Sequence, residues 1–203
     1  MKNNIKTTKR EQIIESALLL FAKYGYHGVC MDDVAREANV AKGTLYNYFL
    51  SKEDLYNSII PFRLDNLLKS IQRAFNKRKD VKQNFKSCIV HIYSFMLKNP
   101  CFFKIWKEGE NRHSFNIKNE TNLPRQKMRN VLLSVLKEGK KERIIKDNID
   151  FELYTDLILG TIEASVERKI KNSKKNEIIP DKKEKENLIK FIFNAINFNN
   201  NYF

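Results

Sequence analysis

Between Tyr24 and Leu55, hydrophobic residues recur at helical spacing and are separated by residues that end helices. The first helix of this stretch carries one apolar stripe, made of Val34, Ala35 and Ala38. It stops at Asn39, because asparagine is one of the few residues other than glycine that tolerates the left-handed backbone of a sharp helix exit. A second helix, 42–49, has two apolar residues on its inner face, Leu45 and Phe49. The pattern predicts a helix-turn-helix.

The other positions of the second helix suit a surface that contacts DNA. They are Lys42, Gly43, Thr44, Tyr46, Asn47 and Tyr48. Thr44 and Asn47 can donate and accept hydrogen bonds at base edges, and Gly43 permits a close approach of the backbone. The two tyrosine hydroxyls and the Lys42 ammonium can reach phosphates. A third helix follows its N-cap residue Ser51, and we expect the side chain of Lys52 to point to the DNA backbone.

A further helix is predicted before this motif. Thr8 and Glu11 have the spacing of a capping box, and the apolar face that follows them ends at Gly25. This helix would support the other two. Several basic residues precede or begin it: Lys2, Lys6, Lys9 and Arg10. They would lie along phosphates or in a minor groove, or they would form a solvated, disordered tail.

Several short segments of the chain keep one register through this region. They are Gly25-Tyr26, Asp32-Asp33-Val34-Ala35, Val40-Ala41-Lys42-Gly43-Thr44-Leu45-Tyr46, Tyr48-Phe49, Ser51-Lys52-Glu53 and Leu55. Together they resemble the DNA-binding region of the tetracycline-repressor (TetR) family of bacterial regulators. Three positions depart from the family's common pattern. Cys30 and Ala41 replace hydroxyl residues that cap helices and reach phosphate, and Asn39 replaces glycine, so no DNA contact is assigned to Cys30 or Ala41.

The resemblance implies an all-α protein of two parts. Residues 1–50 would form a three-helix DNA-binding domain with a helix-turn-helix, and residues 51–203 a larger helical domain for ligand binding and dimerisation. Members of the family are most often repressors. The implied function is a homodimer that binds an inverted-repeat operator in double-stranded DNA and is released by a small-molecule effector.

The periodicity beyond residue 51 predicts further helices. Their expected ranges are 52–78, 81–98, 100–107, 124–138, 151–169 and 188–198, with a polar linker over 171–185. Pro61 lies inside the first of these and cannot donate a backbone hydrogen bond there, which predicts a kink. The kink would serve as a hinge between the two parts, or it would be a tolerated distortion.

Aromatic and other large apolar residues are frequent in the middle helices. Those taken as candidates to line an effector pocket are Tyr93, Met96, Phe103, Trp106 and Phe115. The alternative for each of them is a place in the ordinary hydrophobic core.

The final predicted helix is apolar around more than half of its circumference, whereas a helix packed on one body needs a stripe of only about 100°. A second copy of the same surface is the simplest cover for the excess. The residues assigned to this dimer interface are Tyr154, Leu157, Ile158, Ile162, Ile189, Ile192, Phe193 and Ile196. A two-fold dimer would present two recognition helices about one turn of DNA apart, near 34 Å.

The net charge of +14 is weaker evidence for DNA binding than its size suggests. Residues 1–50 hold seven Lys or Arg and five Asp or Glu, so +12 of the charge lies beyond them. A positive potential favours association with a polyanion. The excess of positive charge in residues 51–203 indicates either an anionic ligand or a Lys-rich composition set by the base content of the genome.

Other classes of function have weaker support in the sequence. We expect a cytoplasmic protein, because no apolar run approaches a membrane span and the N-terminus lacks a secretory signal. Its three cysteines, Cys30, Cys88 and Cys101, have no zinc spacing; reduced structural thiols and a redox role for Cys30 are both open. No metal site, cofactor or catalytic residue is predicted. The alternative to a ligand-released repressor is a nucleoid-associated or cell-division factor of the same fold that works through a protein partner.

Overall fold

The computed structural model of the 203-residue chain describes residues 8–74, 80–111, 123–143, 145, 149–173 and 178–195. The regular elements of these ranges are α-helices, so the all-α prediction is confirmed. No helix within these ranges has both the length and the apolar content needed to cross a membrane. The chain divides into two compact units, and the division falls inside one long helix, after Arg63.

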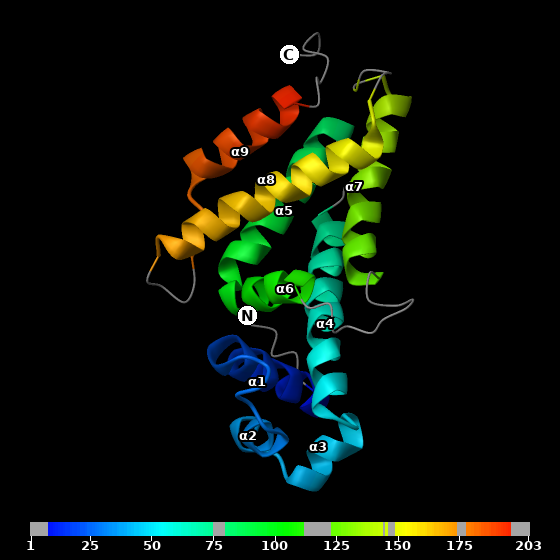
Figure 1. Cartoon of the computed structure of the whole chain (residues 1–203). Helices are drawn as coiled ribbons and strands as arrows, with labels where there is room; N and C mark the ends of the chain where they lie inside the picture. The colour runs from blue at the N-terminus through cyan, green and yellow to red at the C-terminus, as the bar shows by residue number, and fades with distance from the viewer. Residues whose placement is uncertain are drawn as a thin grey trace, which may run out of the picture. The chain divides into compact units, whose positions relative to one another are not determined.

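Of the described residues, the first unit takes 8–63 and 101–111. Its helices are α1 (Lys9–Tyr24), α2 (Met31–Glu37), α3 (Lys42–Tyr48), the first part of α4 (Lys52–Ala74) and α6 (Pro100–Asn111). Within this unit α1 packs on α2, and α2 packs on α3 (Figure 1). No pattern in the sequence indicated that α6 belongs to the same unit as the helix-turn-helix.

The ends of α1 follow from its sequence. The Glu11 amide donates to Thr8 Oγ1 at 3.2 Å, and the Thr8 amide donates to Glu11 Oε2 at 2.8 Å, which confirms the predicted capping box. The helix ends at Gly25, whose φ of 73° is a conformation that side chains disfavour. Both ends are therefore set by local chemistry.

The first unit is held together by apolar side chains that have lost essentially all contact with water. Those at zero exposure are Ile13, Ile14, Ala17, Phe21, Val34, Leu45, Leu55, Ile59, Phe102 and Ile105. The ring of Phe21 also meets the ring of Tyr56 edge to face, with the centroids 5.1 Å apart. Each such Leu, Ile or Phe side chain contributes about 1.5–3 kcal/mol through burial.

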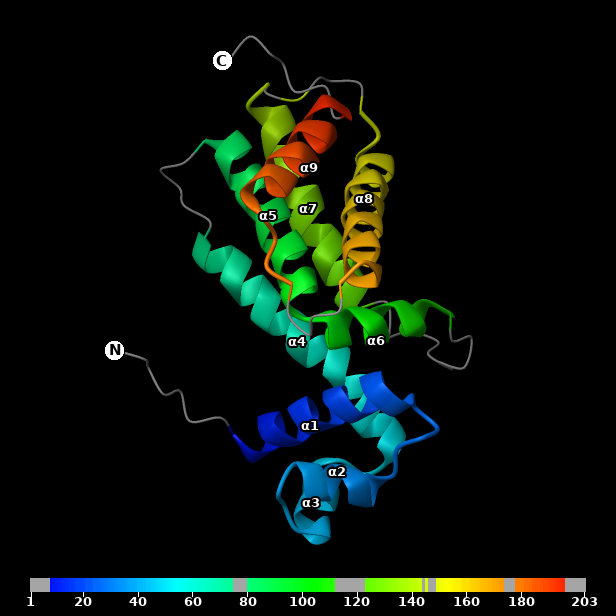
Figure 2. The same ribbon diagram turned by 90° about the vertical axis from the view of Figure 1, so that its left-hand side faces the viewer.

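The second unit contains the described residues of 64–100 and 123–195. Besides the end of α4, its helices are α5 (Val81–Lys98), α7 (Leu123–Lys141), α8 (Phe151–Lys171) and α9 (Lys182–Ala195). Helix α5 packs against α7, α8 and α9 (Figures 1 and 2). The inner face of α5 carries four apolar side chains with no exposed surface: Ile89, Ile92, Met96 and Leu97.

Several helix boundaries differ from the sequence-based ranges: α6, α7 and α8 each extend a few residues beyond them, and α9 differs most. Helix α4 is described as far as Ala74, and the rest of its expected range lies outside the described residues. Helix α9 begins at Lys182, inside the predicted polar linker, because Asp181 caps it. The amides of Lys183 and Glu184 donate to Asp181 Oδ1 at 2.6 and 3.3 Å. The first turn of α9 is therefore helical although it is polar, and the prediction that the linker extends to residue 185 was wrong.

Candidate nucleic-acid interface and the cavity of the second unit

The turn between α2 and α3 has the tight geometry expected of a helix-turn-helix. Asn39 has a φ of 51°, as predicted for the residue that leaves α2. The Val40 amide then donates to the carbonyl of Ala35 at 2.9 Å, which fixes the path of the chain into α3. Val34 and Ala38 are buried beneath the turn. The turn therefore places α3 on a rigid support.

Helix α3 separates its inner and outer residues as its sequence predicted. Leu45 and Phe49 are buried, while Tyr46 and Tyr48 are 40% and 44% exposed. Lys42, Gly43 and Asn47 are also exposed, and Thr44 is half-buried. A side chain at position 43 would meet no atom of the chain within 4 Å, so packing within this chain does not require glycine there. The outer face of α3 is open to a macromolecular ligand.

The first turn of α2 uses a cap that the sequence analysis missed. The carboxylate of Asp33 accepts hydrogen bonds from the Cys30 amide at 3.1 Å and from Cys30 Sγ at 2.8 Å. These bonds hold the pKa of Asp33 below its usual range. An acidic residue at the third helical position, which is one half of a capping box, was the signal available in the sequence. Asp33 thus compensates for the hydroxyl absent at Cys30.

Two lysines beside this surface differ in what their ammonium groups contact. Lys42 is exposed, and its Nζ donates to Asp32 Oδ2 at 3.0 Å; this hydrogen bond raises the pKa of Lys42. Lys52 donates instead to two backbone carbonyls of its own chain, those of Tyr26 at 3.0 Å and Val29 at 2.9 Å. The prediction that Lys52 contacts DNA remains a prediction.

The second unit holds a cavity of about 1010 Å³, which lies at the upper end of the range of 300–1,000 Å³ common for ligand sites. It is bounded by Tyr93 of α5 together with residues of α8, α9 and the segment between them. Arg168 and Lys169 supply positive charge, and Leu188 and Phe191 supply apolar surface. Lys169 also bonds to Glu184, another residue of the wall. The lining combines cationic and apolar groups.

A family model described as bacterial regulatory proteins, tetR family, matches residues 13–59. These residues cover most of α1, all of α2 and α3, and the start of α4. The chain belongs to the tetR family of bacterial regulatory proteins.

Individual relatives of this TetR-family regulator match most of its length. The fatty acid metabolism regulator protein of Bacillus subtilis (strain 168) is 25% identical over 174 residues, which are 86% of this chain and 90% of that protein. The nucleoid occlusion factor SlmA of Vibrio cholerae serotype O1 (strain ATCC 39315 / El Tor Inaba N16961) is 24% identical over 178 residues, 85% and 89% of the two chains.

A solved structure shows the same fold. It is that of the transcriptional regulator FadR from Bacillus subtilis in complex with stearoyl-CoA, with a TM-score of 0.78 and 23% sequence identity. The match covers 89% of this chain and 96% of that chain. The fatty acid metabolism regulator protein and FadR are regulators by their names, and transcription regulators share the fold of this chain.

The residues that we expected to line an effector pocket of this regulator are not brought together. Tyr93 borders the cavity, and burial raises the pKa of its hydroxyl. Met96 is completely buried and is not among the cavity's lining residues. Phe103 and Trp106 are buried residues of α6, in the other unit, and Phe115 lies outside the described residues. Sequence reasoning missed Arg168 and Lys169, because the search considered apolar residues only.

The residues assigned to the dimer interface differ in exposure. Ile158, Ile162 and Ile192 have no exposure in the single subunit, and Ile189 is 8% exposed. Tyr154, Leu157 and Phe193 are half-buried, and Ile196 lies outside the described residues. The large apolar residues open to solvent on the described parts of the same helices are Leu153 and Phe191, at 63% and 59%. The sequence pattern could not tell which side of each helix meets α5.

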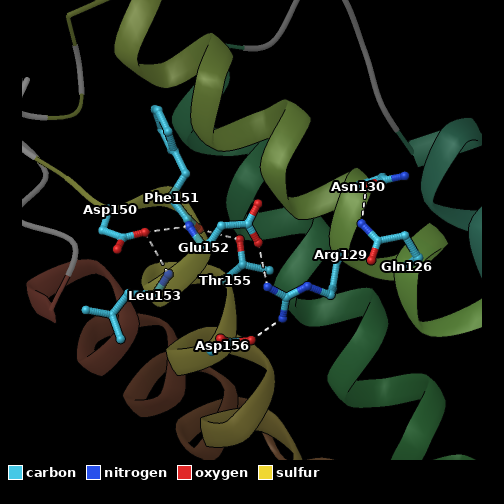
Figure 3. A network of polar contacts seen from close by, with 9 residues as sticks. All are labelled: Gln126, Arg129, Asn130, Asp150, Phe151, Glu152, Leu153, Thr155 and Asp156. Atoms are coloured by element: carbon cyan, nitrogen blue, oxygen red, sulfur yellow. Dashed lines mark hydrogen bonds and ion pairs between the residues drawn. The ribbon is translucent and has the colours of Figure 1, made fainter. Parts of the chain in front are cut away.

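A polar network joins α7 to the first turns of α8 (Figure 3). The Arg129 guanidinium donates to Asp156 and to Glu152 Oε2, the latter at 2.6 Å. These two carboxylates raise the pKa of Arg129, with the Asp156 hydrogen bond the larger cause. Asp150 caps α8 by accepting from the amides of Glu152 and Leu153. The network fixes the start of α8 relative to α7.

Proposed function

We propose that this protein is a homodimeric transcriptional repressor that binds an inverted-repeat operator and dissociates when a small-molecule effector binds its second unit. The exposed polar face of α3, on a helix-turn-helix fixed by a buried core, is the observation that carries the proposal. Membership of a family of DNA-binding regulators supports it.

DNA would be read by the outer face of α3. Thr44 and Asn47 would contact base edges in the major groove, where hydrogen-bonding side chains distinguish base pairs. Tyr46, Tyr48 and Lys42 would hold the phosphate backbone, and Gly43 would let the helix start approach it closely. A two-fold dimer would place two such helices about 34 Å apart, in successive major grooves.

Dimerisation would use the solvent-facing sides of α8 and α9. Leu153 on α8 and Phe191 on α9 are large apolar groups exposed in the single subunit. Gly160, on the same solvent-facing side of α8, is exposed and small, which permits a helix of a second copy to approach closely. In a dimer, Phe191 would lose the exposed surface that a single subunit leaves in water.

The effector would occupy the cavity of the second unit. Arg168 and Lys169 favour an anionic group, and Ile178 and Leu188 favour an attached apolar chain. Stearoyl-CoA, present in the similar FadR structure, combines a long apolar chain with phosphates and is therefore the first compound to test. Because α8 and α9 line the cavity, a ligand there would favour a dimer whose recognition helices are wrongly spaced.

The test is a fluorescence anisotropy titration of the full-length protein on DNA selected from a random library. Addition of stearoyl-CoA should release the DNA, and Arg168→Ala should raise the concentration needed by about tenfold or more. Lys190→Ala removes an exposed positive charge from α9 outside the cavity lining and should leave the release unchanged. Selected DNA that stearoyl-CoA does not displace would contradict the effector assignment and leave the DNA-binding assignment intact.

The similarity to a nucleoid occlusion factor over 85% of the chain favours one second function, a DNA-binding factor that acts through a protein partner. Such a factor would bind sites scattered over a chromosome without regulating the neighbouring genes. Mapping its sites in cells together with transcript levels distinguishes the two functions, because a repressor's sites lie beside genes whose transcripts rise when the protein is deleted.

A further inference from the structure

The wall of the cavity in the second unit contains an ion pair between α8 and α9. Lys169 of α8 donates to Oε1 of Glu184, in the first turn of α9, and both residues line the cavity. Their side chains are 38% and 31% exposed, so water reaches both partners. Arg168, beside Lys169, is exposed and forms no ion pair with a carboxylate of the described residues. One of the two cations of the cavity is therefore already occupied in the free protein.

The bonding of Glu184 in this pair is incomplete. Its Oε1 accepts from Lys169, whereas its Oε2 is shielded from water and has no hydrogen-bond partner among the described residues. A carboxylate oxygen that loses water without gaining a donor raises the free energy of the state that contains it. An ion pair that water reaches on both sides also adds little stability. Glu184 is therefore held weakly, and turning out of the cavity would restore the hydration of Oε2.

An anionic ligand would compete with Glu184 for the same ammonium group. The apolar side chains of Ile178 and Leu188 line this cavity as well, so a ligand chain packed on them can bring its charged end towards Lys169. An ammonium has three N–H donors, but a second anion on it would lie beside the Glu184 carboxylate. Like charges that close repel each other. The ligand anion therefore binds Lys169 favourably only when Glu184 leaves.

We propose that Glu184 is an autoinhibitory residue, which occupies on Lys169 the position of the effector's anionic group and must be displaced when the effector binds. The proposal rests on the effector site proposed above and states how that site is regulated. Because Glu184 belongs to the first turn of α9, its displacement removes a bond between α8 and α9. Ligand binding is thereby coupled to the contact between these two helices.

Direct ligand binding by the full-length protein without DNA tests the proposal. The probe is dansyl-undecanoic acid, a fluorescent carboxylate on an apolar chain. Glu184→Gln keeps the size of the side chain and removes its charge, and it should bind the probe about tenfold more tightly than wild type. The methyl ester of the probe carries no charge and should bind both proteins equally. Equal gains for the acid and the ester would overturn the proposal.

Two further variants separate displacement from a general change of charge. Glu186→Gln removes an exposed negative charge of α9 outside the cavity lining, and it should change the affinity by less than about twofold. Lys169→Met should bind the probe more weakly than wild type, and adding Glu184→Gln to it should give less than about a twofold gain. Equal gains from Glu184→Gln with and without Lys169, or from the two glutamate variants, would overturn the proposal.

A crystal structure of the wild-type protein with the probe covers the case in which a variant does not fold. The probe carboxylate should lie on Lys169, with the side chain of Glu184 turned away. An intact Lys169–Glu184 pair beside the bound probe would overturn the proposal. Failure of stearoyl-CoA to release DNA, with the probe behaving as expected, would count against the proposed effector alone. Release of DNA by stearoyl-CoA with no effect of Glu184→Gln on probe binding would count against the autoinhibitory role alone.

Discussion

The outer face of α3 and the outer face of α8 and α9 differ in what determines their exposure. On α3, a seven-residue helix, the apolar residues are few and spaced four apart, so one face is buried and the rest is open. On α9, apolar residues occupy more than half of the circumference, and α5 covers only part of them. Local spacing therefore determines the exposed face in the first case, and a distant helix determines it in the second.

The substitution with the largest expected effect on the free energy of unfolding tests whether α9 belongs to the core of its own subunit. Ile192→Ala removes a side chain with no exposure and should lower the free energy of unfolding by about 3 kcal/mol. Urea denaturation at one fixed protein concentration measures it, because the stability of a dimer depends on concentration. If the unfolding free energy of the subunit were unchanged while the dimer was lost, Ile192 would be an interface residue.

Phe191, the neighbour of Ile192, should contribute to dimerisation rather than to the stability of the single subunit. Phe191→Asp places a charge at a 59% exposed position and should raise the dissociation constant of the dimer by about thirtyfold or more, because a central aromatic at an interface is worth about 2 kcal/mol or more. Sedimentation equilibrium measures the constant, and circular dichroism should show an intact helical subunit. Lys190→Asp, at the exposed adjacent position, serves as the control for added charge. An unchanged dimer in Phe191→Asp would move the interface elsewhere.

A smaller effect is expected on the α3 face. Tyr46→Ala and Tyr48→Ala should each weaken operator binding by about tenfold, the size of a hydrogen bond to a charged phosphate. Both side chains are exposed, so the melting temperature should hardly change. Tyr24→Ala, which removes another exposed tyrosine of the same unit, should have no effect on binding. Equal losses in all three variants would indicate a general effect on the unit rather than contacts from α3.

The smallest expected effect concerns the cap of α2. The pKa of Asp33 is lowered by the hydrogen bonds from Cys30, so its carboxylate stabilises the folded protein at pH values above the unfolded pKa, about 3.9. This stability is lost as the pH falls through the lower, folded-state pKa. Asp33→Asn should therefore be less stable than wild type at pH 7, with a difference that disappears in acid. Thermal unfolding from pH 7 to pH 2 measures this difference, and a difference that does not vary with pH would exclude the carboxylate as its source.

Features that depend on neighbouring residues could be predicted from the sequence. The capping box at Thr8, the left-handed turn at Asn39 and the inward side of α3 all follow from residues within one or two helical turns. The fold class followed in the same way, because helical periodicity and the scarcity of breakers extend along the whole chain.

Features that depend on distant partners could not be predicted. The bonds from Lys52 to the Tyr26 and Val29 carbonyls span 26 and 23 residues, and nothing in the local pattern marks loop carbonyls as acceptors. The burial of Ile158 and Ile162 depends on how α8 packs in its bundle, which a periodic pattern does not specify. For the same reason Arg168 was not recognised as a cavity residue until α8 and α9 were placed.

Selection of bound sequences from random double-stranded DNA by the full-length protein tests the central claim most directly. The account predicts enrichment of an inverted repeat whose half-site centres lie about one helical turn apart, near 34 Å, with two chains bound per duplex. Enrichment of no sequence, or of a single unrepeated site occupied by one chain, would contradict it.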